Sequence, residues 1–427
     1  TESFEVAGGG TVPQSLCETV HGPLVDREGT TGLSLQSATR GRSIESLAAF
    51  LDIARARGLD DFEAAAARMT ANYNLFYADR LGNIAFYHTG LIPVRAEGSD
   101  RRLPQSGLGD AEWQRFLSFD ELPRSVNPDR GYLVNWNNKP AANWPYASSD
   151  TGFFDQWGPV HRVNVLDDWV SAIPRRSATL ATLEHVNQRA ALTALTRTGD
   201  PFSVVAPDLL PEFLARTNVT ADPRLPRTVR LLADWDLLQD DGDGDGFYDS
   251  PAVPIFQAWW LEASRRVFGD EIPGQPARLF GNLWSRLLSD SPALPLTHDY
   301  LDGASVEEVL TNSLVAALDS LAADSGTSDP SRYRAPVVVR TESAAPGAPS
   351  VTYRLLNRGD YNFLVSYRRF GFVRAQSVMP PGQSWVSTSP HFDDQLDLYL
   401  NFDYKPMNLR FWQVLRNEQS RTVLNVP

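Results

Sequence analysis

An amide-rich segment at residues 131–140 contains side chains that could donate hydrogen bonds in a reaction. It reads Gly-Tyr-Leu-Val-Asn-Trp-Asn-Asn-Lys-Pro, with Asn135, Asn137 and Asn138 around Trp136. A neutral amide N–H can donate a hydrogen bond to a developing oxyanion without adding a proton to the reaction. Asparagines also commonly satisfy the backbone of an irregular loop. The pattern therefore predicts either an oxyanion-binding segment or a structured turn.

An acidic loop offers a second type of site. Asp241, Asp243, Asp245, Gly246 and Asp249 match positions one, three, five, six and nine of a calcium loop, where oxygen ligands alternate and glycine permits a sharp turn. The twelfth position is alanine, so the usual bidentate glutamate is absent. We expect a structural Ca²⁺ site, because this ligand set leaves no obvious open position for catalysis. The alternative is a solvated acidic turn between two helices.

Other catalytic and metal-binding patterns are weak. The sequence has no Gly-x-Ser-x-Gly elbow, which is the usual α/β-hydrolase signature. Cys17 is the single cysteine, so an internal disulfide framework and a cysteine-based zinc site are excluded. The six histidines show no metal-ligand spacing and are interpreted as structural. The carboxylate pair of a glycosidase cannot be chosen from sequence, because its separation is a three-dimensional quantity.

The first ninety residues predict short strands, two helices and a β-hairpin. The first helix follows Ser43, which we expect to cap it, and stops at Gly58. Its expected apolar face consists of Ile44, Leu47, Phe50, Leu51 and Ala54. The predicted strands lie within residues 3–6, 11–25, 30–37, 73–79 and 83–90, and the helices within 43–58 and 59–69.

Residues 95–149 are rich in Gly, Pro, Asp and Trp and predict a long functional loop. Apolar spacing near 3.6 then predicts helices within 161–173, 179–190, 202–217, 227–238, 255–269 and 305–323. Strands are predicted within 335–341, 350–357, 363–373, 383–389 and 396–402. This order indicates an α+β architecture whose sheet is completed by the two ends of the chain. We divide it into 1–161 (core strands and loop), 162–330 (helical region with the acidic loop) and 331–427 (β-rich part).

Composition excludes several classes of protein. The chain has 427 residues, 42% of them hydrophobic, and a net charge of −13, so it has material for a sizeable core and no basic surface for nucleic acid or anionic lipid. No apolar run approaches the about 20 residues that span a bilayer. The start, TESFEVAGGG, has no signal-peptide features, so a targeting peptide was removed or never existed.

Many short motifs in colinear order resemble the heavy (β) chain of penicillin G acylases. The resemblance covers essentially the whole chain. It is carried by Asn135-Trp136-Asn137-Asn138-Lys139-Pro140, together with Glu18-Thr19-Val20-His21-Gly22-Pro23, Tyr77-Ala78-Asp79, Gly82-Asn83-Ile84, His88-Thr89-Gly90, Arg102-Leu103-Pro104, Trp157-Gly158 leading to Arg162-Val163, Pro381-Gly382-Gln383-Ser384 and Asp394-Gln395-Leu396.

The resemblance implies an N-terminal-nucleophile hydrolase with an αββα sandwich, incomplete here, and a helical insertion. In that family a precursor cuts itself, and the freed N-terminal Ser of the heavy chain attacks an amide while its own α-amino group acts as base. Thr1 invites the role of nucleophile, but Thr1-Glu2-Ser3-Phe4-Glu5-Val6 resembles an internal strand of the family. We therefore expect the Ser on an upstream heavy-chain segment, a light (α) chain as partner, and no activity from this chain alone.

Site residues carried over from the family are few. Asn137 matches the side-chain oxyanion donor, and Arg162 matches the arginine that positions the substrate and that asparagine. Phe50 and Tyr73 fall where the family lines its acyl pocket, although ordinary packing explains both equally well. Asp150 matches a carboxylate ligand of a structural Ca²⁺, and Arg101 takes the place of a residue whose carbonyl also binds it.

The implied substrates are small N-acyl amides of the β-lactam or acyl-homoserine-lactone type, and the implied location is the bacterial periplasm or outside the cell. A rival hypothesis is a non-catalytic fragment, or a Ca²⁺-stabilised binding module or pseudoenzyme. It is motivated by the missing nucleophile and the many aromatic residues in loops.

Overall fold

The chain forms two compact units, each with its own buried apolar clusters. The computed structural model describes residues 2–100, 103–146, 160–195, 204–272, 278–289, 296–343, 347–367 and 373–417. One unit comprises Thr1–Leu133 and Lys139–Trp157, and the other comprises Val134–Asn138 and Gly158–Pro427. The short segment Val134–Asn138 thus belongs with the second half of the chain.

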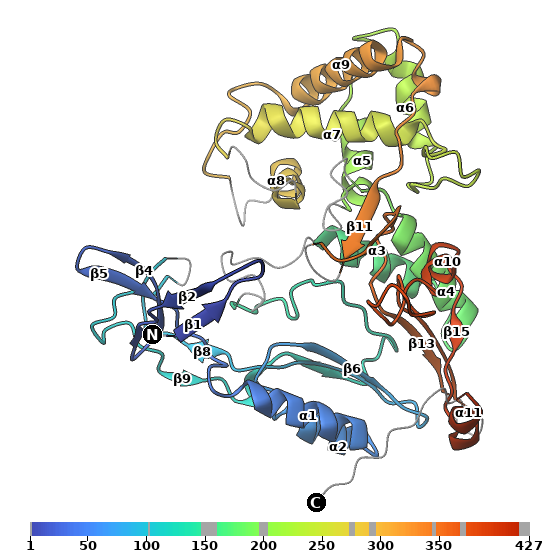
Figure 1. Ribbon diagram of the computed structural model, residues 1–427. Coiled ribbons are helices and arrows are strands. Elements are labelled where there is room, and N and C mark those ends of the chain that lie inside the picture. Colours follow the sequence, from blue (N-terminus) through green and yellow to red (C-terminus); the bar gives the residue numbers. More distant parts are fainter. Residues whose placement is uncertain are drawn as a thin grey trace, which may run out of the picture. The chain divides into compact units, whose positions relative to one another are not determined.

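A three-stranded antiparallel sheet in the order β10–β7–β6 carries the core of the first unit. The predicted hairpin of β6 and β7 forms, and α1 and α2 run side by side along this sheet (Figure 1). The cluster beneath the helices consists of Phe62, Ala66, Ala85 and Tyr87. The elements concerned are α1 (Ser43–Arg55), α2 (Leu59–Ala66), β6 (Asn74–Ala78), β7 (Ile84–His88) and β10 (Arg124–Val126).

Three smaller sheets complete the first unit, and their strands are mostly exposed. They have the orders β1–β2, β3–β4–β5 and β8–β9. Their members are β1 (Glu2–Glu5), β2 (Thr11–Gln14), β3 (Glu18–Thr19), β4 (Gly22–Glu28), β5 (Thr31–Ser34), β8 (Pro93–Val94) and β9 (Arg115–Phe116). The predicted strand-rich start is therefore present, and short strands and a 3₁₀ turn (Phe119–Glu121) also occur within the expected long loop.

Helix α1 departs from its prediction in two ways. Ser43 is its first residue rather than its cap, and the preceding Arg42 makes an ion pair with Glu45 at 2.8 Å instead. The expected apolar face is exposed, since the side chains buried on α1 are Ser46 and Ala49. Ser46 Oγ lies 2.8 Å from Thr70 Oγ1 and accepts from the backbone of residues 70 and 71, so a polar contact holds this side of the helix.

Helices dominate the core of the second unit, where α7 and α9 lie side by side (Figure 1). The fully buried Trp259 of α7 donates to Leu310 O of α9 at 3.0 Å, and Trp284 of α8 donates to Ser264 Oγ of α7 at 3.0 Å. The helices are α3 (Val160–Ser171), α4 (Leu180–Leu192), α5 (Ala206–Ala215), α6 (Leu225–Ala233), α7 (Ala252–Phe268), α8 (Arg278–Leu288) and α9 (Val306–Ser325).

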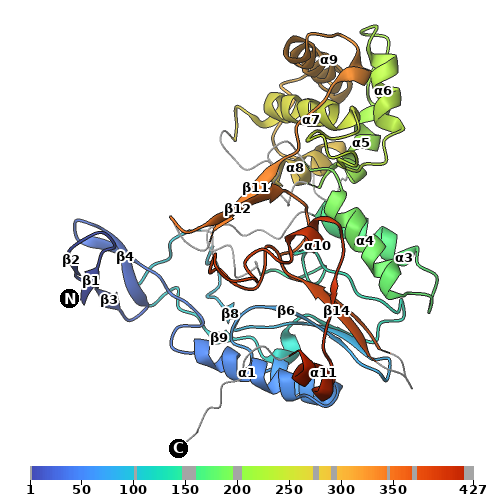
Figure 2. The same ribbon diagram turned by 45° about the vertical axis from the view of Figure 1, so that its right-hand side comes forward.

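Strands return after α9, as the sequence predicts. Strands β11 and β12 form an antiparallel pair and lie side by side in Figure 2. A separate sheet has the order β13–β14–β15. A small core of Ala191, Leu192, Tyr353, Leu356, Val378 and Tyr399 packs this part against α4. The elements are β11 (Val339–Ser343), β12 (Ser350–Arg354), β13 (Asn362–Ser366), β14 (Arg374–Val378), α10 (Leu396–Leu400), β15 (Lys405–Pro406) and α11 (Phe411–Arg416).

Three further sequence expectations are wrong. Residues 396–402 contain helix α10, not a strand, because a short apolar run fits either period and the ring of Tyr399 packs into the core as part of a helical turn. Residues 383–389 form no strand. Helix α8 was not predicted, since Gly281 lowers its helical propensity.

None of the helices in the described ranges is both long enough and apolar enough to cross a membrane.

Candidate active site

Side-chain hydrogen bonds close the segment Val134–Asn138 into a turn. Asn138 Oδ1 accepts from Trp136 N and from Asn135 Nδ2, both at 3.0 Å. Asn135 Oδ1 accepts from Asn137 N at 3.2 Å. Asn137 has φ 59°, in the left-handed region that asparagine tolerates better than most residues other than glycine. The asparagines thus satisfy the loop backbone, as one of the two interpretations from sequence requires.

Arg162 connects this turn to the first turn of α3. Its side chain is buried, and its Nη2 donates to Trp136 O at 3.1 Å and to Asn137 Oδ1 at 2.9 Å. The guanidinium carbon also lies 5.2 Å from the centre of the Trp136 ring, a distance typical of a cation–π contact. The two residues expected to be catalytic, Asn137 and Arg162, therefore lie in direct contact within the second unit.

The contact with Arg162 determines which way the Asn137 amide faces. A guanidinium has donors only, so the atom that it contacts must be the amide oxygen. The Nδ2 group of Asn137 is then directed away from Arg162, and no described residue accepts a hydrogen bond from it. This arrangement presents a neutral N–H donor in a fixed orientation, which is the chemistry required to stabilise an oxyanion.

Phe50 and Tyr73, the candidates for the acyl pocket, lie together in the first unit. Their ring centroids are 5.4 Å apart at an interplanar angle of 73°, an edge-to-face pair. Phe50 belongs to α1 and Tyr73 immediately precedes β6, and the side chains are 38% and 45% exposed. The pair is thus a partly exposed aromatic surface, which both an acyl pocket and ordinary packing explain.

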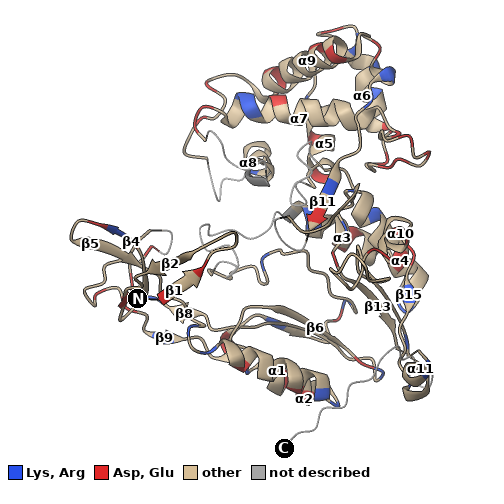
Figure 3. Ribbon diagram, in the orientation of Figure 1, with Lys and Arg blue, Asp and Glu red and all other residues tan. Residues whose placement is uncertain are grey.

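An acidic loop lies between α6 and α7 (Figure 3). Three of its carboxylates come together. One oxygen from each of Asp241, Asp243 and Asp249 lies within 4.8 Å of the other two. Such a spacing fits a central Ca²⁺, since Ca–O distances are about 2.3–2.6 Å. Asp241 Oδ1 is also buried without a hydrogen-bond partner, so a polar atom in the cluster lacks the compensation that a cation would supply.

Asp245 lies outside this cluster and has a different partner. Its carboxylate forms an ion pair with Arg334, and the hydrogen bond from this guanidinium lowers the pKa of Asp245 below its ordinary value. Arg334 also lies over the Phe247 ring at 4.4 Å. Of the four aspartates predicted as ligands, three therefore converge and the fourth binds an arginine.

Arg101 and Asp150, the other predicted metal ligands, lie outside the described residues.

A histidine network next to Arg162 was missed by the sequence interpretation. The buried His161 contacts Asp208 of α5 through Nδ1 at 2.7 Å and Ser285 of α8 through Nε2 at 3.3 Å. These partners are 47 and 124 residues away along the chain, so a local sequence pattern cannot predict the contacts. Sequence patterns predict a structural role for the histidines, and the chain places His161 directly beside the candidate catalytic residue Arg162.

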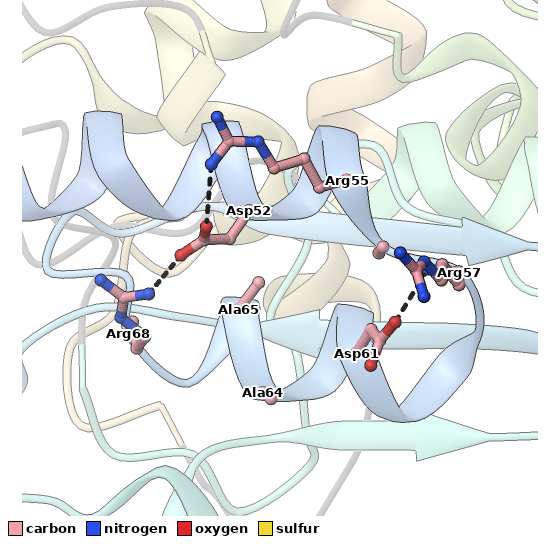
Figure 4. A pocket seen from close by; sticks show the side chains of 8 residues that line it. Asp52, Arg55, Arg57, Asp61, Ala64, Ala65 and Arg68 are labelled. Carbon is pink, nitrogen blue, oxygen red and sulfur yellow. Dashed lines mark hydrogen bonds and ion pairs between the residues drawn. The ribbon is translucent and has the colours of Figure 1, made fainter.

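A cavity of about 370 Å³ between α1 and α2 does not coincide with the predicted site. Figure 4 shows Asp52 between Arg55 and Arg68, with Arg57 beside Asp61. Asp52 forms ion pairs with Arg68 and, at 3.9 Å, with Arg55, so opposite charges largely compensate each other. Neither Phe50 nor Tyr73 lines this cavity.

Comparisons with known proteins agree on one family. The family described as penicillin amidase matches residues 1–415. Penicillin G acylase of Escherichia coli is 27% identical over 471 aligned positions, which cover 100% of this chain and 53% of that protein. The acyl-homoserine lactone acylase QuiP of Pseudomonas syringae pv. syringae is 31% identical over 144 positions, or 32% of this chain and 17% of that protein.

A solved structure shows the same fold. The thermostable penicillin G acylase from Alcaligenes faecalis matches with a TM-score of 0.81 and 27% identity, covering 100% of this chain and 81% of that chain. The fold is thus the mixed helix-and-sheet fold of an N-terminal-nucleophile hydrolase, as the resemblance implied. The chain belongs to the penicillin amidase family. It spans about half the length of the Escherichia coli relative.

The left-handed backbone of Asn137 predicts an unusual order of stabilities. Asn137→Gly and Asn137→Ala lose the same side-chain contact, but only alanine has a Cβ that strains this backbone by roughly 1–2 kcal/mol. We expect the glycine variant to have the higher free energy of unfolding in urea, by about 1 kcal/mol. The control is the exposed Leu261 of helix α7. There the order should be reversed, with Leu261→Gly less stable than Leu261→Ala by about 1 kcal/mol, because glycine is unfavourable inside a helix. Equal free energies of unfolding for Asn137→Gly and Asn137→Ala would contradict the left-handed backbone at this position.

Proposed function

We propose that this chain forms part of an amidohydrolase that cleaves the amide bond of small N-acylated molecules. The nucleophilic oxygen attacks the carbonyl carbon, and the carbonyl oxygen becomes an oxyanion that accepts a hydrogen bond from Asn137 Nδ2. The C–N bond then breaks, the amine leaves with the proton taken from the nucleophile, and water hydrolyses the acyl-enzyme ester. Membership of the penicillin amidase family supports this reaction class.

The contact between Arg162 and Asn137 is the observation that carries this proposal. A donor for an oxyanion must already be oriented before the charge develops, since reorganisation during the reaction would raise the barrier. Arg162 supplies that orientation by occupying the amide oxygen at 2.9 Å. A loop asparagine with a merely structural role would have no need of a buried guanidinium to direct its amide.

The nucleophile in this proposal is a Ser outside these 427 residues. Its hydroxyl attacks while its own α-amino group removes the proton, which combines nucleophile and base in one residue. The Ser belongs to an upstream heavy-chain segment freed by self-cleavage of a precursor, and a light chain is the second partner. The exposed apolar side chains Ile44, Leu47 and Leu51 of α1 support a polypeptide partner, because apolar patches of this kind commonly mark protein interfaces.

The aromatic pair of Phe50 and Tyr73 and the relatives support a proposal for the substrate class. We propose that Phe50 and Tyr73 contact the acyl group, since two partly exposed rings favour an apolar or aromatic acyl chain. The proposed substrates are N-acylated β-lactams and acyl-homoserine lactones. In this proposal Arg162 helps to position the substrate in either case. A panel of N-acyl chromogenic amides that varies the acyl chain identifies the preferred acyl group. We place the enzyme in the bacterial periplasm or outside the cell.

We also propose a structural Ca²⁺ held by Asp241, Asp243 and Asp249. Their spacing and the uncompensated Asp241 Oδ1 support it. The ion would stabilise the loop between α6 and α7 by neutralising its negative charge. Asp245 becomes a ligand only if its ion pair with Arg334 opens. Asp150 and Arg101 are proposed for a second Ca²⁺ site on the basis of the family resemblance.

Removing the Asn137 donor tests the proposed reaction. In the complete enzyme, we expect Asn137→Gly and Asn137→Asp each to lower kcat by roughly a hundredfold or more, since one oxyanion donor contributes about 3–4 kcal/mol to transition-state stabilisation. The glycine variant removes the side chain without backbone strain, and the aspartate variant keeps the oxygen but replaces the N–H. An unchanged kcat in both variants would refute the role of Asn137.

The location of the nucleophile is tested with the isolated chain. We expect the purified 427-residue polypeptide to hydrolyse no N-acyl amide, because the proposed Ser is not part of it. The assay uses chromogenic amides with the complete enzyme as the positive control. Turnover by the isolated chain that disappears on Thr1→Val would overturn this proposal and identify Thr1 as the nucleophile.

Calcium binding is tested by titration calorimetry. We expect Ca²⁺ to bind the wild-type protein and to increase its free energy of unfolding by about 2.7 kcal/mol at a hundredfold excess over Kd. Asp241→Asn combined with Asp243→Asn should abolish the binding assigned to this loop. Asp245→Asn is the matched control and should weaken it only a few-fold, because this carboxylate is paired with Arg334. Identical heats of binding for the wild type and the double variant would contradict the assignment.

A further inference from the structure

The first turn of α3 carries two buried side chains with different partners. Arg162 contacts the Asn137 turn, and the preceding residue, His161, contacts two other helices of the same unit. Consecutive helical residues project about 100° apart, so both sets of contacts act on one helical turn from different directions. The position of Arg162 therefore depends on what holds His161.

Both ring nitrogens of His161 have a protein partner. Nδ1 lies 2.7 Å from Asp208 Oδ2 in the first turn of α5, and Nε2 lies 3.3 Å from Ser285 Oγ on α8. Asn164, three residues further along α3, donates to the same Asp208 oxygen at 2.9 Å. One carboxylate thus receives two hydrogen bonds from the same face of α3. This arrangement fixes the rotation of α3 about its own axis.

The packing around the imidazole leaves no room for it to move. His161 is 1% exposed. A Cβ built on Gly281 of α8 would lie 3.2 Å from His161 Nε2 and 2.9 Å from Val205 Cγ1. Any larger residue at position 281 would therefore force Val205 or α8 to shift. Asp208 belongs to the first turn of α5, where the helix dipole stabilises a carboxylate. Asp208, the partner of His161, is therefore stabilised in its position by its own helix.

A helix terminus without such contacts would be mobile. The terminal N–H groups of a helix lack intrahelical partners, and the first turn commonly frays. A rotation of about 10° displaces a side-chain atom at a radius of about 5–6 Å by about 1 Å. Misplacement of a catalytic group by about 1 Å can reduce the rate about a hundredfold. A small rotation of α3 would thus disturb the Asn137 amide through Arg162.

We propose that His161 is a positioning residue for the oxyanion donor, acting through Arg162. The network of His161, Asp208 and Ser285 fixes the first turn of α3, Arg162 on that turn holds the amide oxygen of Asn137, and Nδ2 is thereby aimed. This role rests on the proposed function of Asn137. It requires no transfer of a proton from His161 and no contact between His161 and the substrate.

Substitutions of His161 in the complete enzyme test the proposal. His161→Leu removes both hydrogen bonds at similar volume, and we expect kcat to fall about 10- to 100-fold while KM changes less than about threefold. His161→Asn places an amide nitrogen near the former Nδ1 and keeps the contact with Asp208, so its kcat should stay within about fivefold of the wild type. This rescue distinguishes positioning from a catalytic imidazole, which asparagine would not replace.

The matched control is Ser264→Ala. It removes the hydrogen bond from Trp284, the neighbour of Ser285 on α8, and destabilises the same helix without touching His161. We expect this variant to lose stability in urea and to keep its kcat. A similar loss of kcat in Ser264→Ala and His161→Leu would mean that general destabilisation causes the effect and would overturn the proposal.

Crystal structures of the variants give a result that does not depend on activity. In His161→Leu we expect the distance between Arg162 Nη2 and Asn137 Oδ1, 2.9 Å in the wild type, to lengthen beyond hydrogen-bonding range. In His161→Asn and Ser264→Ala it should be preserved. An intact contact in His161→Leu refutes the positioning role. If the wild-type enzyme hydrolyses no amide, the proposed function fails, and these distances alone decide whether His161 positions Arg162.

Discussion

The orientation of one amide group is the constraint on which the candidate site depends. An asparagine side chain can direct either its oxygen, which accepts a hydrogen bond, or its nitrogen, which donates one, toward a partner. Only the nitrogen can stabilise an oxyanion. A buried guanidinium removes the ambiguity, because it can only donate. The contact of Arg162 with Asn137 at 2.9 Å thus converts a flexible side chain into a directed donor. The turn around Trp136 and the fixed first turn of α3 both serve that contact.

The turn around Trp136 makes several contacts with the buried guanidinium of Arg162. Arg162 binds two oxygens of the turn and lies over the Trp136 ring. Hydrogen bonds to these oxygens and the contact with an aromatic face offset part of the cost of burying a charge. The composition of the turn therefore suits both the burial of Arg162 and the chemistry of its neighbour.

Sequence periodicity predicted most of the regular structure. The β6–β7 hairpin and the six helices recognised between residues 161 and 323 follow from local patterns and turn residues. Helix α8 was missed because the reason for Gly281 lies in its close approach to Val205 and His161. The exposed face of α1 and the helical residues 396–400 depend likewise on distant neighbours. Asn137 and Arg162 were identified through family resemblance, whereas the network of His161 was invisible, since its partners are far away in sequence.

The left-handed backbone of Asn137 also restricts which residue types are tolerated at this position. Glycine suits the backbone but has no donor, and aspartate suits it but has no N–H. Glutamine carries the amide, but on a longer side chain that would no longer meet Arg162, and its backbone would be strained. Asparagine is the residue that satisfies both demands. Under the proposed role of Asn137, the backbone and the reaction thus select the same residue.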